Sequence, residues 1–137
     1  MASFAAQVGS WATKVEGALE AVFKESAQEL VSQLNELAPV DTGFLRASLM
    51  ASITAMPQMT RANPGAAGPA DLGDIVLVIA GADLGDTIYL GYTANYAAYV
   101  HYGARGNAPR PWVTMVAQRW IAIVEAKAAE VKARLGL

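Results

Sequence analysis

Cysteine is absent from this chain of 137 residues, and histidine occurs only once, as His101. Without cysteine there can be no disulfide and no thiolate metal site, and a reducing compartment is compatible with the composition. A lone histidine would need carboxylates to complete a metal site or a catalytic pair, and the carboxylates show no ligand spacing. The sequence therefore predicts no metal site and no nucleophile–base pair.

Long apolar runs and a basic leader are missing as well. The longest apolar run, residues 75–80, is far shorter than the roughly 20 residues that a membrane-spanning helix requires. The N-terminus lacks the basic segment and apolar block of a signal peptide. We expect a soluble protein without membrane contact and, from its length and ample apolar fraction, a single domain.

Charge of either sign is sparse, and the net charge of −2 hides an uneven distribution. Up to Val100 the chain carries 4 basic and 10 acidic residues, whereas after Val100 it carries 6 basic and 2 acidic ones. This balance lacks the basic excess of a dedicated nucleic-acid-binding protein. The two halves could attract one copy to the next, or their charges could cancel within one fold.

Residues 3–38 have the periodicity of one long amphipathic helix. Apolar side chains recur at steps of three and four from Phe4 onwards, and Pro39 ends the pattern because the residue before a proline avoids the α region. A continuous helix of this length measures about 50 Å, whereas a compact domain of this size is about 35–40 Å across. We expect one end of the apolar stripe to extend beyond the core and to need a partner. The alternative is a break at Gly9 or Gly17.

A turn and a strand are predicted next. Residues 39–43 combine proline, aspartate and glycine, the residues that set up tight turns. Residues 45–54 alternate between apolar and polar or small side chains, which predicts a strand with one buried face. The competing interpretation is a helical turn continuing from Asp41, because Leu45 and Leu49 are also four residues apart.

The middle of the chain predicts a loop and two further strands. Residues 55–73 contain several Pro and Gly turns and little periodicity, so we expect a long flexible loop that orders on a partner or remains a disordered tip. Residues 74–80 form a continuous β-branched and apolar run, typical of a strand covered on both faces. Residues 87–92 predict another strand, paired antiparallel with 74–80 through the short connection.

Residues 95–103 predict a short aromatic helix. Asn95 is a suitable N-cap, and Gly103 can adopt the positive φ that commonly ends a helix. Tyr99 lies on the same face as the tyrosine three residues before it and the valine after it. We expect His101 to act as a hydrogen-bonding residue near the end of this helix.

A proline-braced corner follows and opens the final helix. Pro111 suits the first helical position, and the apolar repeat of residues 113–135 continues to near the C-terminus. The corner displays Arg105 and Arg110 between the two helices. Together the elements predict an α+β domain: a small antiparallel β-sheet packed with long N-terminal and C-terminal helices and a short middle helix.

Asp41-Thr42-Gly43 is the triplet of aspartic proteases, in which two such aspartates share a proton. Those enzymes carry the aspartate on a loop between buried strands, whereas here a long helix and a proline come directly before it. A capped turn is the favoured interpretation of this short, common triplet. The sequence gives no positive sign of an enzyme.

Three segments resemble those of one known family, in the same order. Residues 39–49, Pro-Val-Asp-Thr-Gly-Phe-Leu-Arg-Ala-Ser-Leu, resemble the "P-V-D-T-G-x-L-R-x-S" segment of the tailed-bacteriophage morphogenesis proteins that complete the head–tail joint. Residues 96–103 are similar to their "Y-A-x-Y-V-E-[FY]-G" segment, and residues 108–113 to their "x-P-R-P-F-[LM]" segment. His101 stands where the family usually has glutamate, and Trp112 stands where it has phenylalanine.

This resemblance implies one tail-completion or head–tail connector domain over residues 1–137, with a flexible loop at about 55–73. Such proteins form rings, commonly of six copies, between the head-side connector and the tail. The ring surrounds the channel through which DNA passes without sequence-specific binding. No catalysis, cofactor, membrane or small-molecule substrate is implied, and the expected location is the virion, after assembly in the host bacterial cytoplasm.

The residues expected to contact neighbouring copies or other neck and tail proteins are aromatic, methionine, histidine and arginine side chains. They are Phe4, Trp11, Met56, Met59, Arg61, Tyr99, His101, Arg105, Arg110 and Trp112. For the arginines the alternative is simple solvation, since exposed ion pairs contribute little. Two other functions stay open at this point: a small dimeric adaptor module, and an aspartic-protease-like enzyme using Asp41.

Overall fold

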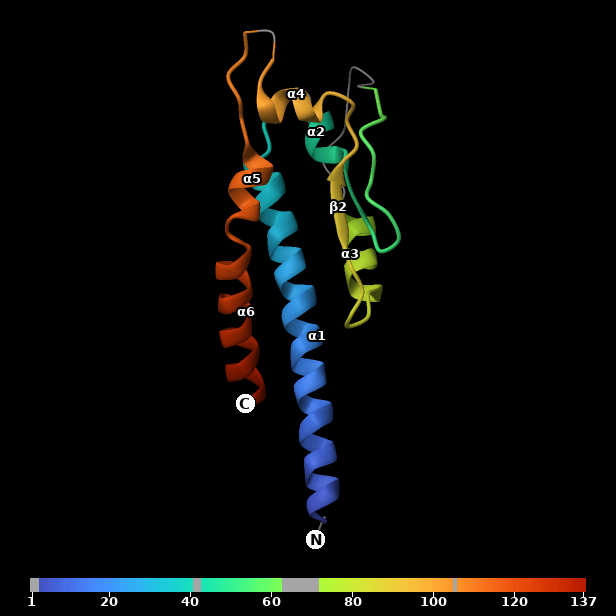
Figure 1. Cartoon of the computed structure of the whole chain (residues 1–137), viewed down its shortest axis with the longest axis vertical. Coiled ribbons are helices and arrows are strands. Elements are labelled where there is room, and N and C mark those ends of the chain that lie inside the picture. The colour runs from blue at the N-terminus through green and yellow to red at the C-terminus, as the bar shows by residue number, and fades with distance from the viewer. Residues whose placement is uncertain (1–2, 41–42, 63–71, 105) are drawn as a thin grey trace.

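The computed structural model describes residues 3–40, 43–62, 72–104 and 106–137. Within them the fold is the predicted α+β type, with one two-stranded antiparallel sheet and long helices at both ends of the chain (Figure 1). In chain order the elements are α1 (Phe4–Leu37), α2 (Phe44–Ala47), β1 (Leu49–Ser52), α3 (Gly73–Gly81), β2 (Tyr89–Tyr92), α4 (Ala97–Tyr102), α5 (Trp112–Ala117) and α6 (Trp120–Leu135).

The first helix is continuous from Phe4 to Leu37, which confirms the prediction of one long helix over the alternative of a helix broken at a glycine. At its start the main-chain N–H of Ala6 donates to Ser3 Oγ at 3.1 Å, which satisfies one of the donors that a helix N-terminus leaves free. Gly9 and Gly17 lie within it without a break. At its end, Arg46 fixes the chain: its Nε donates to the carbonyl of Ala38 at 3.0 Å.

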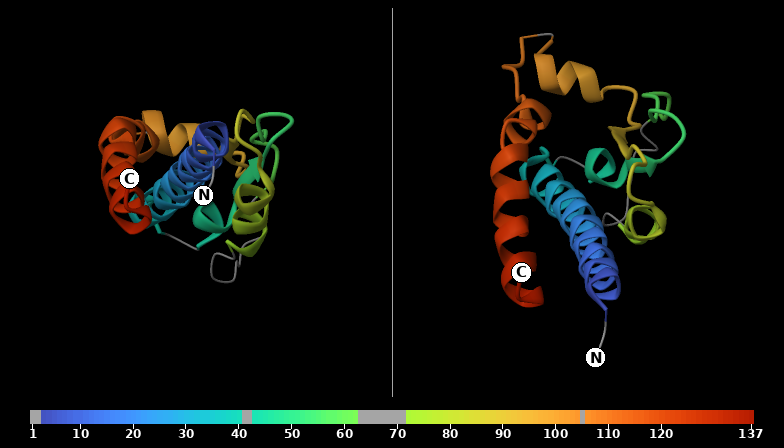
Figure 2. Two further views of the ribbon diagram at one scale, coloured as in Figure 1. Left: turned by 90° about the horizontal axis from the view of Figure 1, so that it is seen from below. Right: turned by 60° about the horizontal axis from the view of Figure 1, so that its bottom comes forward.

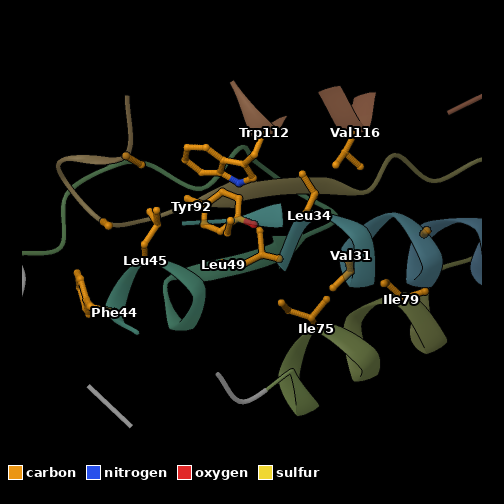
Figure 3. Close-up of a cluster of buried hydrophobic side chains, with 14 residues drawn as sticks. Val31, Leu34, Phe44, Leu45, Leu49, Ile75, Ile79, Tyr92, Trp112 and Val116 are labelled. Atoms are coloured by element: carbon orange, nitrogen blue, oxygen red, sulfur yellow. The ribbon is translucent and has the colours of Figure 1, made fainter. Parts of the chain in front are cut away.

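The core forms around the C-terminal part of α1 (Figure 3). On one side of this helix, α5 contributes Trp112 and Val116. On the other side, α3 contributes Ile75 and Ile79, and β2 contributes Tyr92. The three groups of side chains come from segments far apart in the sequence, so the C-terminal part of α1 is the element around which the chain packs.

Helix α6 runs antiparallel beside α1 and ends well before the N-terminus of α1 is reached (Figures 1 and 2). Near the start of α6, Arg119 Nη1 donates to Gln33 Oε1 at 3.2 Å. Near its end, Arg134 donates from Nη2 to Glu25 Oε2 at 2.6 Å, and this hydrogen bond lowers the pKa of Glu25. The first part of α1 therefore extends beyond the core, as predicted.

The strand predicted at residues 74–80 is wrong, because this segment is helix α3. Only Ile75 and Ile79, four residues apart, are buried, whereas Leu77 between them is 71% exposed. The segment packs on the core through one helical face, so it is not covered on both sides. A short, wholly apolar run fits both periodicities, and the tertiary packing decides between them.

The strand predicted at residues 45–54 is half right. Its first part is the helical turn α2, which was the competing interpretation, and only β1 is extended. Ser48 separates the two, and its Oγ donates to the carbonyl of Leu45 at 2.7 Å. The sheet partner also differs from the prediction: β2 pairs with β1, with Leu49 opposite Tyr92, and not with residues 74–80.

Three details of the C-terminal half also differ. The cap residue of α4 is Tyr96 and not Asn95, and no side chain caps the helix. Pro111 occupies the cap position of α5, one residue before the position predicted for it. The final helix is interrupted after Ala117, where a turn separates α5 from α6. Gly103 does end α4, with φ 84°, as predicted.

Candidate functional site

The protruding part of α1 carries a bare apolar stripe. We call residues 4–15 the α1 free end. Phe4 is 82% exposed, Val8 is 47% exposed and Trp11 is 62% exposed. These positions follow the spacing i, i+4, i+7, so the three side chains share one face of the helix. An exposed stripe with two aromatic residues is typical of a surface that another protein covers.

The second feature is an apolar groove at the other end of the molecule, with a volume of about 500 Å³. Its walls are the segment 56–59, strand β2, helix α4 and the start of α5. The side chains of Met56 and Met59 line it and are about half exposed. Methionine is flexible and polarisable, so such a wall can adapt to an incoming apolar side chain.

A glycine in β2 shapes this groove. A Cβ atom at Gly91 would lie 3.0 Å from Met56 Cε and 3.3 Å from the carbonyl oxygen of Pro57. Glycine therefore lets the 56–57 segment lie directly against the strand. A glycine inside a strand is a known sign of close approach by another segment, but the sequence of residues 87–92 does not show which segment approaches Gly91.

The floor of the groove is aromatic. Trp112 is 3% exposed and stands edge-on to Tyr92, with ring centroids 5.2 Å apart. The Tyr92 hydroxyl donates to Asn35 Oδ1 at 2.8 Å, and burial raises the pKa of Tyr92 to about 12. The hydroxyl thus keeps its proton at neutral pH, and these residues form a fixed floor.

His101 is part of the same wall and is buried. Its Nε2 lies 3.0 Å from Thr114 Oγ1, which links α4 to α5, so the hydrogen-bonding role expected of this histidine is confirmed. Within the residues that the structure describes, its Nδ1 is buried without a hydrogen-bond partner. Its principal role in the fold is to hold the aromatic helix against the floor of the groove.

Two of the segments that line the groove carry positive charge only, whereas Leu34 lines it from α1, which also carries Glu29 and Glu36. Residues 43–62 and 87–124 contain no aspartate or glutamate, but they contain arginines. Arg61 lies with its guanidinium 5.5 Å from the ring centroid of Phe44, and its main-chain N–H donates to the carbonyl of Thr93 at 2.8 Å. Arg110 is exposed at the corner before α5. These two segments of the groove lining are therefore basic.

The structure separates the ten predicted contact residues into groups. Met56, Met59, His101 and Trp112 line the groove, but the last two are buried and act in the fold itself. Arg61, Tyr99 and Arg110 are exposed on the same half of the molecule. Phe4 and Trp11 lie at the opposite end, on the α1 free end. Arg105 lies outside the described residues. Contact with a partner stays a prediction for the exposed residues.

Other kinds of site find no support in the part of the chain that the structure describes. There, no cluster of three or more His, Asp or Glu side chains could hold a metal ion. Asp41, the candidate of the protease interpretation, lies outside the described residues. Among the described helices, none has the length and apolarity needed to cross a membrane.

The family of the chain follows from its first three quarters. A family model described as "Bacteriophage HK97-gp10, putative tail-component" matches residues 2–103. The chain belongs to this family. It is a family of phage tail-completion and head–tail joint proteins, so this HK97-gp10-like chain is a structural virion component that interacts with other virion proteins. No curated protein and no solved structure matches the chain.

The matched segment contains α1, both strands, α3 and α4, and with them most of the groove. Two of the three segments that carry the resemblance, residues 39–49 and 96–103, lie inside the match. The third, residues 108–113, lies beyond it and supplies Trp112, the floor of the groove. The gp10-like part of the chain thus includes the α1 free end and the methionine wall.

Proposed function

We propose that the protein is a ring-forming subunit of the head–tail joint of a tailed phage or prophage. Six copies surround the DNA channel and link the head-side connector to the tail. The observation that carries the proposal is the α1 free end, where one copy leaves an aromatic stripe uncovered. Because a large exposed apolar surface is a liability in a free monomer, assembly with other copies or other virion proteins is its natural use.

The arrangement of the two surfaces favours a ring over a dimeric adaptor. The stripe and the groove differ in shape. The N-terminal part of α1, which carries the stripe, and helices α4 and α5, which line the groove, lie at opposite ends of the molecule (Figure 1). Unlike surfaces on one chain make heterologous contacts, which close into rings when the rotation between neighbours allows it. A two-fold dimer most simply uses one patch that binds the same patch on the other copy. The stripe and the groove are two different surfaces, so they fit a ring contact better than such a dimer.

The charge of the chain suits a channel wall through which DNA passes. The net charge of −2 gives no basic excess that would hold the phosphate backbone tightly. The exposed side chains near the corner, including Tyr99 and Arg110, are available for the next ring along the channel. We assign the mature protein to the virion neck and its assembly to the host cytoplasm.

The proposed function predicts a specific defect when the gene is deleted from its phage or prophage. Without the joint, DNA-filled heads and finished tails should accumulate separately, and infectious particles should fall by several orders of magnitude. Electron microscopy of the lysate and a plaque count measure both. A plasmid copy of the wild-type gene should restore joined particles. Joined, infectious particles without the protein would contradict the proposal.

A further inference from the structure

We infer that the groove of one copy takes up the α1 free end of the next copy. The inference rests on the proposed ring and names the contact that builds it. Its occupant is the stripe formed by Phe4, Val8 and Trp11, and its receptor is the groove between the segment 56–59 and the start of α5. Both surfaces are present once in every copy, so each copy gives one contact and receives one.

The chemistry of the two surfaces is complementary. An amphipathic helix that binds a hydrophobic groove presents anchors at i, i+4 and i+7, which is the spacing of the three exposed side chains. The groove offers an aromatic floor at Trp112 and an adaptable methionine wall. Aromatic anchors such as Trp11 dominate the binding energy of interfaces when they enter an apolar pocket.

The groove cannot be filled by the free end of its own chain. Helix α1 is straight and is held along α6 by the contacts of Gln33 and Glu25, and its N-terminus points away from α4 and α5 (Figures 1 and 2). To bend back, α1 would have to break within its continuous helical segment. The occupant must therefore come from another molecule, and the ring supplies a neighbour with an identical stripe.

Cysteine cross-linking tests the contact directly, because the chain has no cysteine of its own. One variant carries Val8→Cys and Met59→Cys, and its matched control carries Leu77→Cys and Met59→Cys. All three sites are exposed, so folding should be retained, which circular dichroism checks. Both proteins are oxidised at the highest attainable concentration and separated on a non-reducing gel.

We expect the V8C/M59C variant to give a ladder of covalent multimers beyond the dimer, with at least ten times the yield of the control. Mixing the two single-cysteine variants, V8C and M59C, should give dimers only. A cross-linking yield equal to that of the control overturns the docking. If the wild-type protein is nevertheless a discrete large oligomer, the proposed ring is retained and only this contact is wrong. A double-cysteine product that stops at a doubly linked dimer supports the docking and overturns the ring.

Discussion

Changing Phe4 and Trp11 to alanine should convert the assembled protein into a monomer of 14.4 kDa without lowering its stability. Both side chains are exposed in the single chain, and alanine preserves the helix. Each aromatic anchor of an interface typically contributes about 2 kcal/mol or more. Losing two should weaken every contact by about 1,000-fold, which mass measurement in solution would detect.

A matched control separates this effect from a general loss of exposed apolar surface. Val76 and Leu77 are comparably exposed on α3, away from both proposed contact surfaces. The Val76→Ala, Leu77→Ala double variant should assemble like the wild type. If the control dissociates and the Phe4→Ala, Trp11→Ala variant remains assembled, the α1 free end is not the surface that holds copies together.

The second large effect concerns the floor of the groove. Trp112→Ala should lower the free energy of unfolding by about 3 kcal/mol. This value is near the lower end of the range for buried aromatic residues, because neighbouring side chains can relax into the space beside the open groove. The indole is 3% exposed and contacts Tyr92 edge-on. Urea unfolding measures the loss.

The chain provides its own comparison for this prediction. Trp11→Ala removes the same side chain from an exposed position, and it should change the free energy of unfolding of the monomer by no more than about 0.5 kcal/mol. One tryptophan thus supports the fold, and the other remains available for assembly. Equal losses at Trp112 and Trp11 would show that this division is incorrect.

The long helix and its overhang could be predicted because they depend on local rules. The apolar repeat from Phe4 onwards, the stop at Pro39 and the rise per residue together require a helix longer than its own core. Such arguments need no knowledge of what packs against the helix. The same is true of the end of α4 at Gly103, where the positive φ favours glycine.

Helix α3 could not be predicted in this way. Its apolar run is only one strand length, and both a helix and a strand accommodate Ile75 and Ile79. The decision depends on α1 and β1, which cover only one face of the segment and leave Leu77 in solvent. The choice of β1 as the partner of β2 follows from the same packing.

The groove also depends on packing between distant segments. Gly91 is informative only once the segment carrying Met56 is known to lie against it. His101 and Trp112 belong to segments that resemble the family, and both were expected at an interface, yet the structure places them in its interior. Sequence patterns locate such residues, but they do not show whether a side chain is buried beneath a contact surface or exposed on it.

A reconstruction of the assembled protein by electron cryomicroscopy tests the central claim most directly. We expect a closed ring in which residues 4–15 of each copy lie in the groove of its neighbour, with Trp11 against the methionine wall. A ring in which this segment lies bare in solvent, or an assembly held together through other surfaces, would contradict it.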